Sequence, residues 1–176
     1  MPEPIRGLQL ANNITELTVI APLKRGKADQ LRKILEGRMS AYKQGTMKSP
    51  IELIQTIHYA RWVIIAGGEL LLFTSNYDGD LGGYLEDFAE RDELALNLIF
   101  GFCDGWPGVR PVGPFIAYVK KYQLSASFYY GAYAKYTVKE VKRALYWKQQ
   151  TEQFLRGGLN EAQYRQALAA PTPWPL

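Results

Sequence analysis

The sequence predicts an α+β chain in which the elements follow the order strand, helix, strand, strand, helix, strand. Three observations predict it. A strand pattern over 15–21 precedes a helical pattern, two strand patterns flank Gly67-Gly68, and a long helical region precedes an aromatic strand pattern over 125–133. Right-handed crossovers on both sides of a central hairpin give an antiparallel sheet with helices on one face.

The first strand and helix show clear periodicity. Over 15–21, Leu17, Val19 and Ala21 recur at every second position, as in a half-buried strand, and Pro22 ends the run. After Gly26, apolar residues recur at helical spacing up to Gly45. This predicted core-facing stripe consists of Leu31, Ile34, Leu35, Met39 and Tyr42.

The second and third strands are predicted over 56–66 and 69–75, joined by a two-residue hairpin at Gly67-Gly68. A turn over 76–80 then supplies an Asp for a helix N-terminus. Two apolar stripes predict a long helical insertion, the first formed by Leu81, Tyr84, Leu85 and Phe88 and the second by Leu94, Leu98 and Phe102.

The last third of the chain is predicted to hold a loop, the fourth strand and added helices. The Gly- and Pro-rich segment 105–114 is the loop, 116–122 a short helix and 125–133 the strand. Thr137 and Glu140 have the spacing of a capping box, and Gly157-Gly158 ends the helix that it starts. Asn160 is positioned to cap a short helix through Ala169.

Composition predicts a soluble, cytoplasmic protein. The 176 residues carry a net charge of +4 and a single cysteine, Cys103, which cannot form an internal disulfide. The chain does not begin with the pattern of a secretory signal, and no apolar run reaches the roughly 18 residues of a transmembrane helix. We therefore expect no integral membrane segment.

Charged residues form three blocks of alternating sign. Eight basic residues face two acids over 24–48, eight acids face one basic residue over 78–104, and nine basic residues face two acids over 110–156. Such blocks are either solvated faces or complementary surfaces, within the fold or between chains.

The order of elements resembles that of the dimeric α/β-barrel superfamily. The resemblance covers roughly 15–133 and rests on the strand Ile57-His58-Tyr59-Ala60-Arg61-Trp62-Val63-Ile64 and the run Leu71-Leu72-Phe73-Thr74-Ser75-Asn76-Tyr77-Asp78-Gly79. It implies a ferredoxin-like sheet that pairs face to face with a second copy in a homodimer. Its members include cofactor-free monooxygenases, small-molecule isomerases and haem proteins, and fold alone does not select among them.

With this resemblance the chain divides into three parts. These are an irregular N-terminal segment over 1–14, a ferredoxin-like domain with a C-terminal helix over 15–156, and a short helix with a Pro-rich tail over 157–176. We find no internal repeat.

His58 is the only histidine, and its side chain suits a structural hydrogen bond, proton transfer or substrate orientation. We predict His58 and Tyr129 as catalytic candidates, and Arg61, Trp62 and Tyr133 as ligand-binding candidates. The tyrosine-rich last third would line a pocket for a small apolar or aromatic ligand, or form a core and dimer interface. Arg61 requires an anionic partner, which the acids of 78–104 offer.

Other functions receive less support. One histidine and one cysteine do not make a zinc site, so no metal or cofactor is predicted, and haem binding is the weaker alternative. The segment 69–75 lacks the basic residue and alternating aromatics of RNA-recognition strands, so no nucleic acid is predicted. The main alternative to ligand binding is a non-enzymatic accessory module that docks a protein through its charged blocks.

Overall fold

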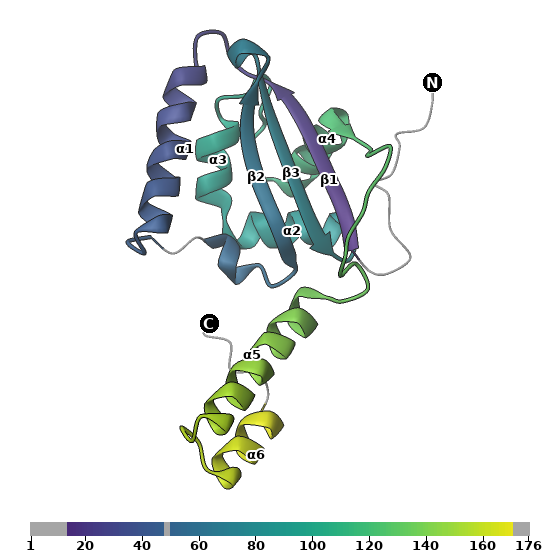
Figure 1. Ribbon diagram of the computed structural model, residues 1–176. Helices are drawn as coiled ribbons and strands as arrows, with labels where there is room; N and C mark the ends of the chain where they lie inside the picture. Colours follow the sequence, from purple (N-terminus) through teal and green to yellow (C-terminus); the bar gives the residue numbers. More distant parts are fainter. Residues whose placement is uncertain (1–13, 48–49, 171–176) are drawn as a thin grey trace.

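An antiparallel sheet organises the chain in the computed structural model, which describes residues 14–47 and 50–170 (Figure 1). Within these residues the sheet has four strands in the order β2-β3-β1-β4. Every neighbouring pair is antiparallel, and β2 and β4 form the edges. The bounds are Ile14–Pro22 for β1, Ile57–Ile65 for β2, Leu70–Asp78 for β3 and Gln123–Leu124 for β4.

Helices cover one face of this sheet and extend the chain beyond it. In Figure 1, α2, α3 and α4 lie behind the sheet, α1 runs beside β2, and α5 and α6 project from one end as a helical hairpin. The predicted α+β chain with an antiparallel sheet and C-terminal helices is therefore confirmed. The helices are α1 (Ala28–Lys43), α2 (Leu81–Arg91), α3 (Glu93–Phe100), α4 (Val112–Tyr122), α5 (Val138–Leu155) and α6 (Glu161–Ala169), with short 3₁₀ turns η1 (Pro50–Leu53) and η2 (Ala66–Gly68).

The core lies between the sheet and the covering helices. Alternate residues of β1 and β3 point into it, as the period of two requires. Phe73 lies at its centre, with its ring 5.0 Å from that of Trp62 and 5.9 Å from that of Phe100. Tyr77 stacks on Tyr84 of α2 at 3.7 Å, which fixes α2 against β3.

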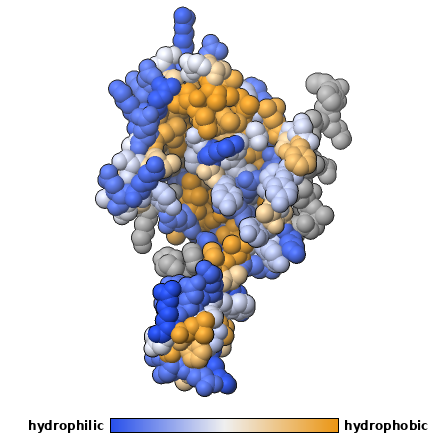
Figure 2. Space-filling view, viewed as in Figure 1, coloured by the Kyte–Doolittle hydropathy of each residue, from blue (hydrophilic) through white to orange (hydrophobic). Residues whose placement is uncertain are grey.

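The opposite face of the sheet remains open and has two different halves. Figure 2 shows a hydrophobic patch over the hairpin end of the strands, where Val63, Leu72 and Ile20 face outward. At the other end the face is polar. There the backbone N–H of Ala126 donates to the buried carboxylate of Glu16 (3.0 Å), so the segment after β4 is held over β1.

The structure corrects the predicted third and fourth strands. The fourth strand is not 125–133 but the two residues Gln123–Leu124, because the aromatic residues that follow lie in an irregular segment. The third strand does not end at 75 but continues to Asp78, and the turn begins at Gly79.

The hairpin and α3 also differ from prediction. The hairpin is at the predicted place, but its turn spans the four residues between the paired Ile65 and Leu70. In α3 the predicted stripe points the wrong way: Leu94 is 87% exposed and Leu98 45%, while Leu96 and Ile99 are buried. Eight residues allow two apolar faces, and packing on the sheet selects one.

The predicted helix caps are confirmed. Asp80 accepts from the backbone N–H of Gly83, and the capping boxes of Thr137 with Glu140 and of Asn160 with Gln163 are both complete. Within 14–47 and 50–170 no helix has the length and apolar content needed to span a membrane.

The hairpin turn anchors α1 through a close approach at Gly68. Gly68 has φ +101°, and a Cβ built there would lie 2.8 Å from the Cβ of Ala28, while Gly67 has φ +64° and open space around it. We expect Gly67→Ala to cost about 1 kcal/mol for its left-handed backbone and Gly68→Ala about 2–3 kcal/mol, since overpacking adds to the strain. Chemical denaturation measures both, and equal losses would contradict the role of this contact.

Candidate functional site

The apolar stripe of α1 does not become a closed core. Leu31 is fully buried, but further along the same stripe Met39 is 54% exposed and Tyr42 50%. The N-terminal end of α1 is held against the hairpin turn, and Figure 1 shows the helix separating from β2 toward its C-terminal end. A pocket of about 440 Å³ fills this wedge, and we call it the α1 pocket.

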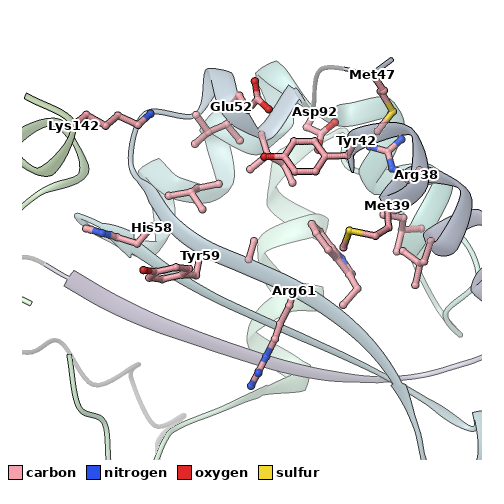
Figure 3. A pocket seen from close by; sticks show the side chains of 17 residues that line it. Arg38, Met39, Tyr42, Met47, Glu52, His58, Tyr59, Arg61, Asp92 and Lys142 are labelled. Carbon is pink, nitrogen blue, oxygen red and sulfur yellow. The ribbon is translucent and has the colours of Figure 1, made fainter. Parts of the chain in front are cut away.

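The walls of the α1 pocket are mainly apolar and come from distant parts of the sequence (Figure 3). Such walls, and a volume within the roughly 300–1,000 Å³ typical of ligand sites, are what small-molecule pockets offer. The apolar lining residues are Leu35, Met39, Tyr42 and Met47 from α1 and its C-terminal side, Ile51 and Ile54 at η1, Ile57, Ala60 and Trp62 from β2, and Ile99 from α3.

Two residues that line this pocket each have a buried polar atom with no hydrogen-bond partner in the described part of the chain. The two atoms are Oδ1 of Asp92 and the indole Nε1 of Trp62. Asp92 joins α2 to α3 and is only 4% exposed. An Asp at this position normally caps the following helix, but its side chain makes no capping bond here. Asp92 therefore lines the pocket without capping α3.

The electrostatic state of Asp92 follows from its burial. Burial raises the pKa of Asp92 from its ordinary 3.8 to about 6, against the opposing field of Arg38 on α1. Arg38 lines the same pocket but forms no ion pair with Asp92 among the described residues. At neutral pH the pocket thus contains a buried carboxylate with incomplete compensation.

His58 lies at the pocket through an irregularity of β2. Ile57 pairs with Tyr77 and Tyr59 with Asn76, so His58 is the extra residue of a β-bulge. Its Nε2 lies 2.8 Å from Oδ1 of Asp78, and both side chains are largely buried. The other oxygen of Asp78 accepts from the backbone N–H of Val138 (2.8 Å), the first residue of α5. Lys142, one turn later, reaches the pocket in Figure 3.

The sequence-predicted site residues divide between two hollows. His58, Arg61 and Trp62 all line the α1 pocket. Tyr129 instead lines a second hollow of about 490 Å³ on the polar half of the open sheet face, which we call the sheet hollow. Tyr133 is 71% exposed and lines neither.

Arg61 borders both hollows, but its side chain points away from the α1 pocket in Figure 3. Its Nε donates to the hydroxyl of Thr74 across the strand pair at 2.8 Å. The expected carboxylate partner from 78–104 is absent in the described residues, and Asp78 contacts His58 instead. Exposure makes this acceptable, because water solvates the guanidinium.

Several polar side chains line the sheet hollow. They include Glu16, Thr18, Thr74 and Asn76 from the strands, and Tyr129 from the segment after β4. Burial raises the pKa of the Tyr129 hydroxyl, as do the nearby Glu16 and Tyr59, so this hydroxyl is a proton donor rather than a base.

Sequence reasoning missed Asp92 and Arg38. In sequence Asp92 is one acid in an acidic block, and Arg38 one cation in a basic block. One signal was present: Arg38 lies next to Met39 on the edge of the apolar stripe of α1. Only the tertiary approach of α1 to the start of α3 brings the two charges together.

Two further observations concern metal and thiol chemistry. Over 14–47 and 50–170, no three His, Cys, Asp or Glu side chains gather in a way that would hold a metal ion. Cys103 is fully buried, and burial raises the pKa of its thiol to about 12. This agrees with an unreactive thiol beside the end of α3.

Comparison of the chain with protein-family models, curated proteins and solved structures gave no match.

Asp92 should make the stability of the protein depend on pH. Its folded-state pKa of about 6 lies above 3.8, so the folded state holds the proton more tightly and loses up to about 3 kcal/mol of stability as pH rises from 4 to 6. We expect Asp92→Asn to be more stable than the wild type at pH 7, with the gap closing toward pH 4. Thermal unfolding across this range measures it, with Glu90→Gln, an exposed acid on α2, as the control. A gap that does not change with pH would contradict the burial of a charged Asp92.

Proposed function

We propose that this protein binds a small, largely apolar ligand in the α1 pocket. The observation that carries the proposal is that the apolar stripe of α1 lines a cavity where a core would otherwise close. Leaving Leu35, Met39 and Ile54 around a cavity costs packing energy, which an apolar occupant would restore.

We also propose that the fold is ferredoxin-like and that the chain forms a homodimer through its open sheet face. The strand order, read as β4-β1-β3-β2, and the connection of β1 to β2 through α1 support the fold. The apolar half of the open face supports the dimer, since Val63 is 40% exposed beside other outward-facing apolar residues. Outside it, Phe128 and Tyr130 are also exposed and available to a second copy.

The proposal is binding rather than a particular reaction. His58 and Tyr129, the two catalytic candidates, line different hollows on the two faces of the sheet. An oxidation or isomerisation shared by these two residues therefore has no support from their geometry. His58 alone, oriented by Asp78, is in position to contact a ligand in the α1 pocket and exchange a proton with it.

Protein docking is the second candidate function. The α5–α6 hairpin projects from the sheet in Figure 1, and on it Leu145 and Leu155 are exposed. The same helix α5 also carries basic residues, including Lys139 and Lys148. This arrangement favours an acidic partner, but it ranks below ligand binding because the hairpin offers no enclosed surface.

Ligand binding is tested with N-phenyl-1-naphthylamine, a neutral aromatic probe that fluoresces more strongly in apolar surroundings. We expect saturable binding to the wild type and a loss of about tenfold or more in affinity for Met39→Trp, which fills the mouth of the pocket. Leu94→Trp adds the same ring on the exposed side of α3, outside the pocket, and should bind the probe normally. Equal affinity of the two variants for the probe would show that the probe binds outside the α1 pocket.

The dimer is tested by sedimentation velocity. We expect the wild type to sediment at twice the mass of one chain, and Val63→Glu to sediment as a monomer, because a carboxylate would be buried without a partner at the interface. Leu94→Glu, on the helical side, should remain dimeric. A wild type that is monomeric at high micromolar concentration would rule out pairing through the sheet.

A further inference from the structure

We infer that the ligand of the α1 pocket carries an amine, whose cation donates a hydrogen bond to the carboxylate of Asp92. The inference rests on the proposed binding function and specifies its ligand class: an apolar body with a protonated primary or secondary amine. Its basis is a pair of pocket-lining residues, Asp92 and Trp62, whose buried polar atoms have no partner among the described residues.

Asp92 is the first of the two residues whose buried polar atoms support this inference. Its side chain is almost completely buried, yet Oδ1 has no donor among the described residues. Buried carboxylate oxygens almost always have a hydrogen-bond donor. Burying a charged carboxylate oxygen without one costs far more free energy than burying a neutral polar group without a partner. Asp92 is the N-cap residue of α3, but its side chain makes no capping hydrogen bond. The Asp92 carboxylate thus stabilises no neighbouring element through a hydrogen bond of its own.

Trp62 is the second residue, and its evidence is independent of Asp92. Its indole N–H is buried and has no partner among the described residues, although Trp62 lines the same pocket from β2 and its ring packs against Phe73. Two residues on different walls of one mainly apolar pocket therefore each carry a buried polar atom without a partner among the described residues. This is the arrangement of a ligand site, in which few polar groups orient a mainly apolar molecule.

The charges around Asp92 favour a cationic donor over a neutral one. Arg38 of α1 is the cation whose field reaches Asp92, and no ion pair joins them in the described ranges. The other charged or titratable groups that line the pocket are Glu52, His58 and Lys142, together with the more distant Arg61. In Figure 3, Asp92 and Arg38 lie at one side of the view and His58 and Lys142 at the other. His58 is engaged by Asp78, so an ammonium group beside Asp92 would complete the compensation of its charge.

The experiment compares matched naphthalene probes that displace N-phenyl-1-naphthylamine. These are 1-naphthylmethylamine, 1-naphthylmethanol and 1-naphthylacetate, which share the ring system and differ in the polar group. At pH 7.5 we expect the amine to bind about tenfold or more tightly than the alcohol and the carboxylate to bind least. The affinity for the amine should fall as pH drops below about 6, where Asp92 takes up a proton, while the affinity for the alcohol stays constant.

Asp92→Asn tests the residue itself. We expect this variant to bind amine and alcohol within about threefold of each other. The control Glu90→Gln, which removes an exposed acid outside the pocket, should keep the preference for the amine.

The outcomes separate the two proposals. If N-phenyl-1-naphthylamine binds but all three naphthalenes compete equally, or the carboxylate competes best, water or Arg38 satisfies Asp92 and the amine inference is wrong. If the preference for the amine persists in Asp92→Asn, the amine binds elsewhere and the inference is also wrong. If no probe binds saturably to the wild type, the binding function itself fails.

Discussion

The carboxylate of Asp78 joins the end of the β2–β3 strand pair to the start of α5. One oxygen contacts His58 at the bulge of edge strand β2, and the other accepts the first backbone N–H of α5. A carboxylate at a helix N-terminus is favourable both for its hydrogen bond and for the helix dipole. Since the α5–α6 hairpin makes few other contacts with the sheet, this one side chain orients α5 and brings Lys142 to the rim of the α1 pocket.

The bulge at His58 has a second consequence for the pocket. An extra residue on an edge strand increases the local twist and redirects the side chain that it adds. Here the added side chain turns to Asp78, while Ala60 and Trp62 further along β2 keep the regular alternation and face the helices. The wall of the pocket that β2 forms is therefore irregular and polar at His58, and regular and apolar at Ala60 and Trp62.

Local signals in the sequence predicted those features that local energetics determine. The capping box at Thr137 and the turn at Gly67-Gly68 depend on neighbours a few residues away, and both lie where the sequence indicates. The run 125–133 has strand-forming aromatics, but only Gln123–Leu124 pairs with β1, so the later residues lack a partner strand. Strand pairing is a tertiary event, and composition alone does not determine where it ends.

The candidate site shows the same division. His58 and Trp62 could be identified in advance because a lone histidine and a tryptophan in a strand are conspicuous, and both line the α1 pocket. Asp92 could not, because an acid between two helices is the ordinary sequence of a cap. Its role depends on the separation of α1 from the sheet, which occurs at the end of the helix opposite to the approach of Gly68 to Ala28.

The α1 pocket therefore combines two costs to stability that a purely structural chain would have no reason to keep. One is apolar surface without a closed core, and the other is a buried carboxylate oxygen of Asp92 without a donor among the described residues. The aromatic core around Phe73, which lies next to Trp62 on the same face of the sheet, is closely packed and can offset both costs. A rigid sheet beside a loosely filled wedge is what ligand binding requires, because the site must remain open when empty. The two unfavourable features lie in the same cavity, and one occupant with an apolar body and a cationic donor would relieve both.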